Sequence, residues 1–372
     1  MTVHNFALHK HFTPADKASD DYAYVPFTLP RPARRLHIAY TYSAQMSSDM
    51  VEGGNVIDIG LFDPTGMDFP GGAGFRGWSG SARNEFTIGR DEATPGYRPG
   101  PLPAGEYHVL LGLYRIWPQG ADVDIDIEAD LIDDADAMSS ERAAHNDKPA
   151  DRVPVDRLLP TFWLRGDLQS HTYHSDAKGT PDQLVSKAEA LGLDFLAITD
   201  HNTVSHHAEL AEQAAKHGVL LLRGQEATTY YGHMNIWGTG RWCDFRCRTT
   251  EDMAQVIALA HANGGVCSIN HPKIGGPPWE YATEVPVQAM EVWQGPWVNR
   301  NTESFALWDR LLSEGRRLPG VGGSDYHCPS GEETSFSRLG QPTTWVKVTE
   351  RSEDAILAAI CALLHFAKPD VE

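Results

Sequence analysis

The sequence predicts a multidomain β + α/β protein, with an N-terminal β-sandwich followed by an α/β barrel. Short strand-like segments separated by glycine- and proline-rich turns fill the first part of the chain. Strand-like and helix-like segments then alternate toward the C-terminus, which is typical of a parallel sheet. Polar residues between the two parts indicate a linker. We therefore predict a sandwich over residues 1–135, a linker over 136–157 and a barrel over 158–372.

The first domain is predicted from five strand-like segments: LHIAYTYS (36–43), NVIDIGLFD (55–63), EFTIG (85–89), EYHVLLGLYRI (106–116) and ADVDIDIEADLI (121–132). In the last of them Val123, Ile125 and Ile127 alternate with acidic residues, as in a sheet with one buried face. Because no helical periodicity separates the strands, the pattern predicts a β-sandwich. Its acidic face fits solvent exposure or, less commonly, calcium binding. The domain would serve packing or homo-oligomerisation, or alternatively sugar binding or substrate gating.

The second domain begins where strands and helices start to alternate. In TPDQLVSKAEALG, Thr180 is the expected N-cap, Pro181 takes the first helical position, Gln183 completes a capping box and Gly192 ends the helix. The strand DFLAITD, the helix HHAELAEQAAKHG and the strand VLLLRGQE follow. Later, EDMAQVIALAHANGG precedes VCSINHP, and SFALWDRLLSEG precedes GVGGSD. About seven such units predict a barrel that closes on itself.

Charge and cysteine usage narrow the range of partners and compartments. The 372 residues include 31 basic and 50 acidic ones, a net charge of −19, which argues against binding a nucleic-acid backbone or an anionic membrane. A small anionic substrate stays compatible, because bound metal ions reverse the local potential. Five scattered cysteines predict a reducing compartment, and Cys243 with Cys247 is either half of a metal site or two incidental thiols. Without a signal-like start or a bilayer-spanning apolar run, we expect a cytoplasmic protein.

Imidazoles and carboxylates follow the predicted strands of the second domain. The carboxyl ends of barrel strands face one rim, so these side chains are expected to meet there. Short pairs such as D-H and D-x-H predict at least one zinc, manganese or iron ion. The candidate ligands are His171, Asp176, His201, Glu226, His233, His271, Asp325 and His327, with Gln169 as a ninth. The other imidazoles of this region are predicted to be surface residues, with His174 alternatively assisting the site: His174, His206, His207, His217 and His261.

Five motifs between about residues 160 and 350 resemble the PHP (polymerase and histidinol phosphatase) superfamily, and within it the CehA/McbA branch. They are GDLQSHTYHSD, GLDFLAITDHN, GQEATTYYGHMN, INHP and GGSDYH. The resemblance implies a distorted (β/α)7 barrel with two or three divalent ions. It implies a first ion at Gln169, His171, Glu226 and Asp325, a second at Glu226, His233 and His271, and a third at Asp176, His201 and His327.

The chain departs from the family pattern at Gln169, where the family commonly has histidine. An amide oxygen is a poorer ligand than imidazole for zinc-like ions. We therefore expect the first site to be weak, empty or filled by an ion that prefers oxygen. A second departure is the end of the chain, LLHFAKPDVE, which would leave the last barrel element incomplete.

The predicted reaction is hydrolysis of an ester bond by a water that the metal ions activate. A phosphoester is preferred over a carboxylic or carbamate ester, and a non-catalytic metal- or ligand-binding module is a third alternative. Asp325 or Asp200 would orient the water, and His201, His327 or His174 would protonate the leaving group. Asp200 would alternatively hold a neighbouring imidazole in place.

The predicted substrate is a small-molecule ester. Lys273 is a candidate for holding its phosphate, and Tyr231 and Trp293 are candidates for contacts with an aromatic part. Core packing is the alternative for the two aromatic residues. Arg223 is a second phosphate candidate, with a strand-end surface charge as the alternative.

Overall fold

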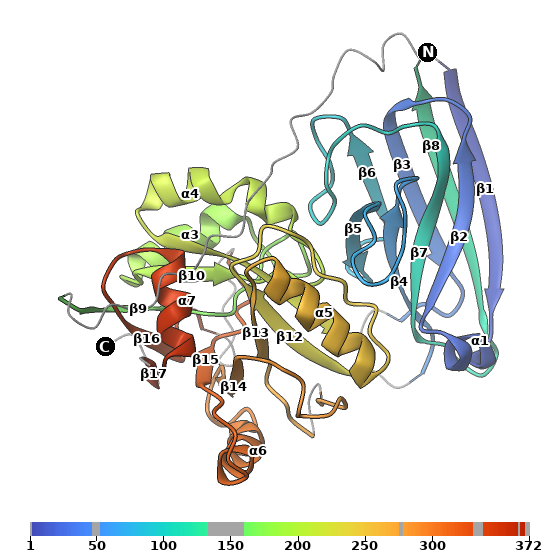
Figure 1. The fold of residues 1–372 in the computed structure, drawn as a ribbon. Helices are drawn as coiled ribbons and strands as arrows, with labels where there is room; N and C mark the ends of the chain where they lie inside the picture. Colours follow the sequence, from blue (N-terminus) through green and yellow to red (C-terminus); the bar gives the residue numbers. More distant parts are fainter. Residues whose placement is uncertain are drawn as a thin grey trace. The chain divides into compact units, whose positions relative to one another are not determined.

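The chain divides into two compact units, Met1–Asn146 and Asp147–Glu372 (Figure 1). The computed structural model describes residues 2–46, 53–132, 160–274, 278–329, 338–363 and 365–368. The predicted linker at 136–157 lies outside the described residues. Among the described helices, none combines the length and the apolar character needed to cross a membrane.

The first unit is built from two four-stranded antiparallel sheets, as Figure 1 shows in blue to teal. One sheet has the spatial order β1 (Thr2–Phe12), β8 (Ala121–Leu131), β3 (Ala33–Tyr42) and β6 (Glu85–Gly89). The other has the order β2 (Tyr22–Leu29), β7 (Gly105–Arg115), β4 (Val56–Phe62) and β5 (Phe75–Gly80).

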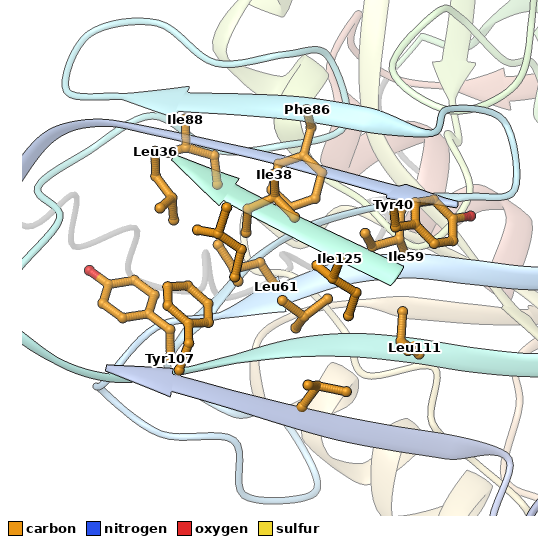
Figure 2. Close-up of a cluster of buried hydrophobic side chains, with 14 of the residues drawn as sticks. Leu36, Ile38, Tyr40, Ile59, Leu61, Phe86, Ile88, Tyr107, Leu111 and Ile125 are labelled. Carbon is orange, nitrogen blue, oxygen red and sulfur yellow. The ribbon is translucent and has the colours of Figure 1, made fainter. Parts of the chain in front are cut away.

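The two sheets share one hydrophobic core. Figure 2 shows side chains of both sheets pointing toward one another, among them Ile38 and Ile125 from one sheet and Leu61 and Leu111 from the other. All four of these side chains are buried. Burying such aliphatic side chains contributes about 1.5–3 kcal/mol each, so this shared core is the main source of stability in the unit.

The alternation read in the segment 121–132 is confirmed in β8. Val123, Ile125 and Ile127 are buried, whereas Asp122 and Asp124 between them are exposed. The five predicted strands are present, and β1, β2 and β5 were not predicted. A short helix, α1 (Pro14–Ser19), also lies in this otherwise β unit.

The second unit holds a nine-stranded sheet within the described part of the chain. Its spatial order is β15 (Gly320–Gly323), β14 (Ala289–Gln294), β13 (Val266–Ile269), β12 (Gly232–Trp237), β11 (Leu220–Thr229), β10 (Phe195–Ile198), β9 (Phe162–Asp167), β16 (Thr343–Val348) and β17 (His365–Lys368). The sheet is nearly closed, because Thr344 Oγ1 of β16 donates to the Gly322 carbonyl of β15 at 2.8 Å. The predicted barrel-like sheet is therefore confirmed.

The sheet is more mixed than repeated β–α units predict. Parallel pairs join β9 to β10, β10 to β11, β13 to β14 and β14 to β15. Antiparallel pairs join β11 to β12, β12 to β13, β9 to β16 and β16 to β17. The pairing of β16 with β17 means that residues 365–368 form a strand of the sheet. From the sequence, this part of the chain was expected to leave the last barrel element incomplete.

Helices lie between these strands and pack on the sheet (Figure 1). They are α3 (Pro181–Ala190), the 3-10 helix η1 (Ser205–Ala208), α4 (Leu210–His217), α5 (Thr250–Ala262), α6 (Asn301–Ser313) and α7 (Glu353–Cys361). The capping box predicted for α3 is present, with Thr180 and Gln183 bonded reciprocally. The single helix predicted over HHAELAEQAAKHG is instead divided into η1 and α4 at Glu209.

Candidate metal centre

The strand ends of the second unit are joined to one another by backbone hydrogen bonds. Such bonds fix the relative positions of segments that lie far apart in the sequence. They run from Asp325 N to Gln169 O at 3.0 Å, from His171 N to Tyr326 O at 2.9 Å, from Glu226 N to Thr199 O at 3.0 Å and from Asn270 N to His233 O at 2.9 Å. These backbone hydrogen bonds by themselves therefore hold the predicted ligands at neighbouring positions.

Positive φ angles occur at several of these strand ends. Asn202, His271 and Asp325 have φ values of 58°, 26° and 54°. This region costs a non-glycine residue free energy, and such strain concentrates at functional sites. At Gly323 the strand passes so close to its neighbours that an added Cβ would lie 2.7 Å from Gln169 Cβ, which explains the glycine in GGSDYH.

Among the described residues, the donor atoms gather into three groups that could each hold a metal ion. Within each group the ligand atoms lie within 4.8 Å of one another. The groups are His171, Glu226 and Asp325; Glu226, His233 and His271; and His171, Asp176, His201 and His327. His171 and Glu226 each belong to two groups, so the three groups form one connected cluster.

Glu226 lies at the centre of this cluster. Its Oε1 is 3.2 Å from both His233 Nδ1 and His271 Nε2. Its Oε2 is 3.3 Å from His171 Nε2 and 3.2 Å from His201 Nδ1. A carboxylate with imidazoles against both oxygens has the arrangement expected of a group that bridges two ions.

The electrostatics of the cluster favour ionised carboxylates. Burial acts to raise the pKa of Glu226, but the surrounding imidazoles, His201 first, hold it well below its usual range. Burial opposes ionisation of Asp325 in the same way, and His327 and His171 lower its pKa. Carboxylates that stay charged are the form that binds divalent cations.

The third group opens toward solvent. Asp176 Oδ1 lies 3.3 Å from His327 Nε2 and 3.6 Å from His201 Nε2, and the Asp176 side chain is 49% exposed. The His171 ring stacks against the rings of both His201 and His327, at centroid distances of 4.3 and 4.2 Å. The buried His171 therefore joins the more accessible third group to the group of Glu226 and Asp325.

Several donor atoms of the cluster lack the hydrogen bonds that buried polar atoms normally make. Within the described structure no hydrogen-bond partner is found for His171 Nε2, His233 Nδ1, Glu226 Oε2 and Gln169 Oε1. Imidazole nitrogens and carboxylate oxygens at this spacing are the donors that zinc, manganese and iron prefer. The residues present therefore fit divalent metal ions.

A comparison with known domain families matches one region of the chain. Residues 167–284 match the PHP domain family. The matched stretch makes up less than half of the chain. It contains most of the clustered donors, while Asp325 and His327 follow it in the sequence. The CehA/McbA branch within the superfamily stays a prediction.

Two curated relatives are similar to part of the chain. A stretch of 105 residues is 34% identical to the 5'-3' exoribonuclease Rnm of Escherichia coli, covering 25% of this chain and 36% of that protein. A stretch of 78 residues is 33% identical to the 3',5'-nucleoside bisphosphate phosphatase of Chromobacterium violaceum, covering 21% of this chain and 27% of that protein. The chain thus spans well under half the length of either relative.

One solved structure is similar to part of the chain. It is a two-domain protein with a PHP-like metal-dependent phosphoesterase domain from Bacteroides vulgatus. The two chains are 22% identical, with a TM-score of 0.44 over 59% of this chain and 69% of the other.

Gln169 lies beside the donor group of His171, Glu226 and Asp325. Its Nε2 donates to Asp325 Oδ1 at 3.3 Å, and the whole residue is buried. Its Oε1 is one of the buried atoms for which the described structure shows no hydrogen-bond partner. The amide therefore stands where a ligand was predicted and offers an oxygen in place of an imidazole nitrogen.

Asp200 is turned away from the cluster. Its carboxylate accepts hydrogen bonds from Thr172 N, Thr172 Oγ1 and Ser175 Oγ, each at 2.7 Å. Its Oδ2 also lies 3.1 Å from His206 Nδ1. The geometry gives no support for Asp200 as the water-orienting group, and the imidazole it contacts is His206 rather than the adjacent His201.

The surface assignment of two other imidazoles is wrong. His206 is fully buried, and its Nε2 lies 3.1 Å from the Ile198 carbonyl. His174 is also buried, with its nitrogens 2.7 Å from Ser205 Oγ and 2.8 Å from Glu209 Oε1. Both nitrogens of His174 are thus engaged away from the cluster, so proton delivery from this residue has no geometric support.

Of the predicted substrate contacts, Lys273 has a side chain that is linked to the cluster through Gln294. It is buried, and its ammonium donates to Gln294, which in turn bonds Asp325. Trp293 Nε1 donates to the Gly295 carbonyl at 3.0 Å and its ring lies against Trp297.

The other two substrate candidates make contacts elsewhere. The ring of Tyr231 lies 6.3 Å from that of Tyr281. Arg223 forms two hydrogen bonds to Glu353 Oε2, at 3.0 and 2.6 Å. This contact supports the alternative that Arg223 is a charge at a strand end and not a phosphate ligand.

Three residues of the site were not predicted. Asn270 Nδ2 donates to Glu226 Oε1 at 3.1 Å, and the buried Glu291 accepts from His271 N at 3.1 Å. Gln294 Nε2 donates to Asp325 Oδ2 at 2.6 Å. Asn270 directly follows β13 and Gln294 ends β14, so their positions at strand ends could have indicated them, whereas Glu291 lies within β14 and carries no such signal.

Proposed function

We propose that this chain is a metal-dependent hydrolase that cleaves a phosphoester bond with a metal-activated water. The observation that carries the proposal is the sharing of His171 and Glu226 among three donor groups, which suits closely spaced ions. The PHP domain match and the partial similarity to a nucleoside bisphosphate phosphatase support a phosphoester as the bond that is cleaved.

The donor groups would hold the ions as follows. A first ion would use His171, Glu226, Asp325 and the Gln169 oxygen, and a second would use Glu226, His233 and His271. A third would use Asp176, His201 and His327. Divalent ions there would supply a Lewis acid for the phosphoryl oxygen and lower the pKa of a bound water.

The chain's own groups would position the reactants. Asp325 Oδ1 lies on the cluster side, 2.9 Å from His171 Nε2, and is suited to accept a proton from the attacking water. His201 and His327 border the open group, with side chains 20% and 31% exposed, which suits proton transfer to a leaving oxygen. The same nitrogens would be ligands of a third ion. A nitrogen that binds an ion cannot donate a proton, so each histidine has only one of these two roles at a time.

The His327 tautomer follows from its contacts. Its Nδ1 donates to the Asp325 carbonyl at 2.8 Å, which leaves Nε2 facing Asp176. Lys273, whose ammonium is held by Gln294 close to Asp325, is the cation suited to a substrate oxyanion.

The substrate we propose is a small-molecule phosphoester. The net charge of −19 disfavours a long nucleic-acid backbone, although one partial relative is an exoribonuclease. Cytoplasmic location and homo-oligomerisation through the first unit are further expectations.

The test is an assay of protein purified without chelator against an aryl phosphate, an aryl carboxylic ester and an N-methylcarbamate, together with elemental analysis. We expect bound divalent metal and turnover of the phosphate, abolished by chelation and restored by Mn²⁺ or Zn²⁺. Turnover of the ester or carbamate alone would overturn the phosphoester assignment. Bound metal without any turnover would favour a binding module.

A further inference from the structure

We propose that Gln294 is a positioning residue that fixes the carboxylate of Asp325 for the metal cluster. This inference rests on the proposed function. Gln294 ends β14, beside the strand that leads to Asp325. Its Nε2 donates to Asp325 Oδ2 at 2.6 Å, and its Oε1 accepts from the Lys273 ammonium. The amide therefore links a buried cation to a carboxylate of the cluster.

The orientation of the Gln294 amide is decided by its partners. Oε1 accepts from Asn299 Nδ2 at 2.8 Å as well as from Lys273. A lysine ammonium only donates hydrogen bonds, so the amide oxygen must face it and the NH₂ group must face Asp325. The contact to Asp325 is thus a donor–acceptor bond to a charged group, which is among the stronger hydrogen bonds.

The backbone of Gln294 is fixed as well. Its N–H donates to Asn301 Oδ1 at 2.7 Å, and Asn301 Nδ2 donates back to the Gln294 carbonyl at 2.9 Å. Asn301 is fully buried at the start of α6. The next residue, Gly295, donates its N–H to the Gly323 carbonyl at 3.0 Å, two positions before Asp325. These backbone contacts consequently fix the position of Gln294 relative to Asp325.

These contacts give the two oxygens of Asp325 different roles. Oδ1 faces His171 Nε2 at 2.9 Å and accepts from Gln169 Nε2 at 3.3 Å, whereas Oδ2 receives the Gln294 amide. Oδ1 is then the oxygen that faces the donor atoms of the first group. An amide orients Asp325 without adding charge, whereas a carboxylate at position 294 would place a second negative group against Asp325.

The test compares Gln294→Met, which keeps length but removes the donor, and Gln294→Glu, which replaces the donor by an acceptor. Gln288→Glu is the matched control, because Gln288 directly precedes β14 at the end away from Asp325. Each chelator-stripped protein is titrated calorimetrically with MnCl₂, and kcat, KM and the thermal midpoint are measured with an aryl phosphate.

We expect both Gln294 variants to bind Mn²⁺ roughly 10–100-fold more weakly at one or more sites and to lose kcat by a similar factor, with KM changed less than about threefold. The control should keep wild-type affinity. A folded Gln294→Met or Gln294→Glu protein with wild-type Mn²⁺ affinity would overturn the inference, as would a lowered thermal midpoint without any change in affinity. If the wild-type protein binds Mn²⁺ but hydrolyses nothing, the proposed function fails while the titration still decides the role of Gln294.

Discussion

Glu226 Oε2 lies 3.3 Å from His171 Nε2, and both side chains are completely buried. An anionic carboxylate and an imidazole taken out of water are stable only when they are paired or bind a cation. Each of the two residues belongs to two of the three donor groups. This pair is therefore the point where the groups join, and its loss should affect more than one metal position.

Replacing Glu226 by glutamine should remove metal and activity together. The neutral amide would face imidazoles on both sides and could no longer bridge two ions. We expect the metal content per chain to fall by at least half and turnover of an aryl phosphate to fall by at least about 100-fold. Mass-spectrometric elemental analysis and initial rates measure both. Glu212→Gln, an exposed change in α4, is the control; a Glu226→Gln protein with the metal content of that control would contradict the bridging role.

Replacing Gln169 by histidine should strengthen the first donor group. The buried amide already stands beside Asp325, so an imidazole there would supply the nitrogen ligand that zinc-like ions prefer. We expect Zn²⁺ content to rise toward one further ion per chain, with roughly tenfold tighter binding of the weakest Zn²⁺ ion. Competition with a chromogenic chelator measures the affinity. Unchanged Zn²⁺ stoichiometry and affinity would show that position 169 does not contact a metal.

Replacing Asp200 by asparagine should destabilise the segment that follows His171. The carboxylate accepts from Thr172 and Ser175, and an amide would place an NH₂ group against at least one of those donors. We expect a loss of about 2–4 kcal/mol in the free energy of unfolding, because a buried charged hydrogen-bond network is broken. Urea denaturation measures it, with the exposed Asp309→Asn as control. Asp200→Asn protein that keeps wild-type stability but loses all turnover would instead indicate a direct catalytic role.

The contact between α3 and α4 should depend on pH through His217. Hydrogen bonds to Asp182 and Glu189, each at 3.0 Å, raise the pKa of His217 above its usual 6.5. A raised pKa in the folded state means that this stabilisation is complete below the unfolded value and is lost as pH rises through the folded value. Wild type should therefore be more stable than His217→Gln at pH 6, and the difference should shrink by pH 8.5. Urea denaturation at both values tests this; a difference that grows with pH would refute it.

The sequence was most informative where periodicity and local chemistry agree. Strand β8 shows this, because its side chains alternate strictly between core and solvent. Helix α3 shows it again, since Thr180 and Gln183 set its start without help from tertiary contacts. The order of imidazoles and carboxylates along the second unit likewise indicated which side chains would meet.

The hairpin of β11 and β12 was not foreseen, because its register pairs Thr229 with Gly232 across Tyr230 and Tyr231, residues that carry no strong turn signal. His233 consequently lies near the start of β12 and not at the end of a strand, yet its Nδ1 lies 3.2 Å from Glu226 Oε1. A hairpin without a strong local turn signal depends on packing against the rest of the sheet, so a short sequence window does not predict it.

Gln294 and Asp200 illustrate a second reason why the structure differs from the prediction made from the sequence. A glutamine carries no strong metal-binding signal in a sequence, so only the observed bonds to Asp325 and Lys273 mark Gln294. Asp200 carries the signal, standing next to His201, but its side chain points toward Thr172. Adjacency in sequence does not decide direction, since successive residues of an extended segment point to opposite sides.

We propose that His171, Glu226, His271 and Asp325 hold divalent ions, and a crystal structure of protein purified without chelator tests this proposal most directly. Anomalous scattering at the zinc, iron and manganese edges would locate and identify the ions. We expect at least two ions bridged by Glu226, with nitrogen and oxygen ligands at about 2.0–2.3 Å. Density without any ion between these side chains, in protein that is active on an aryl phosphate, would contradict the account.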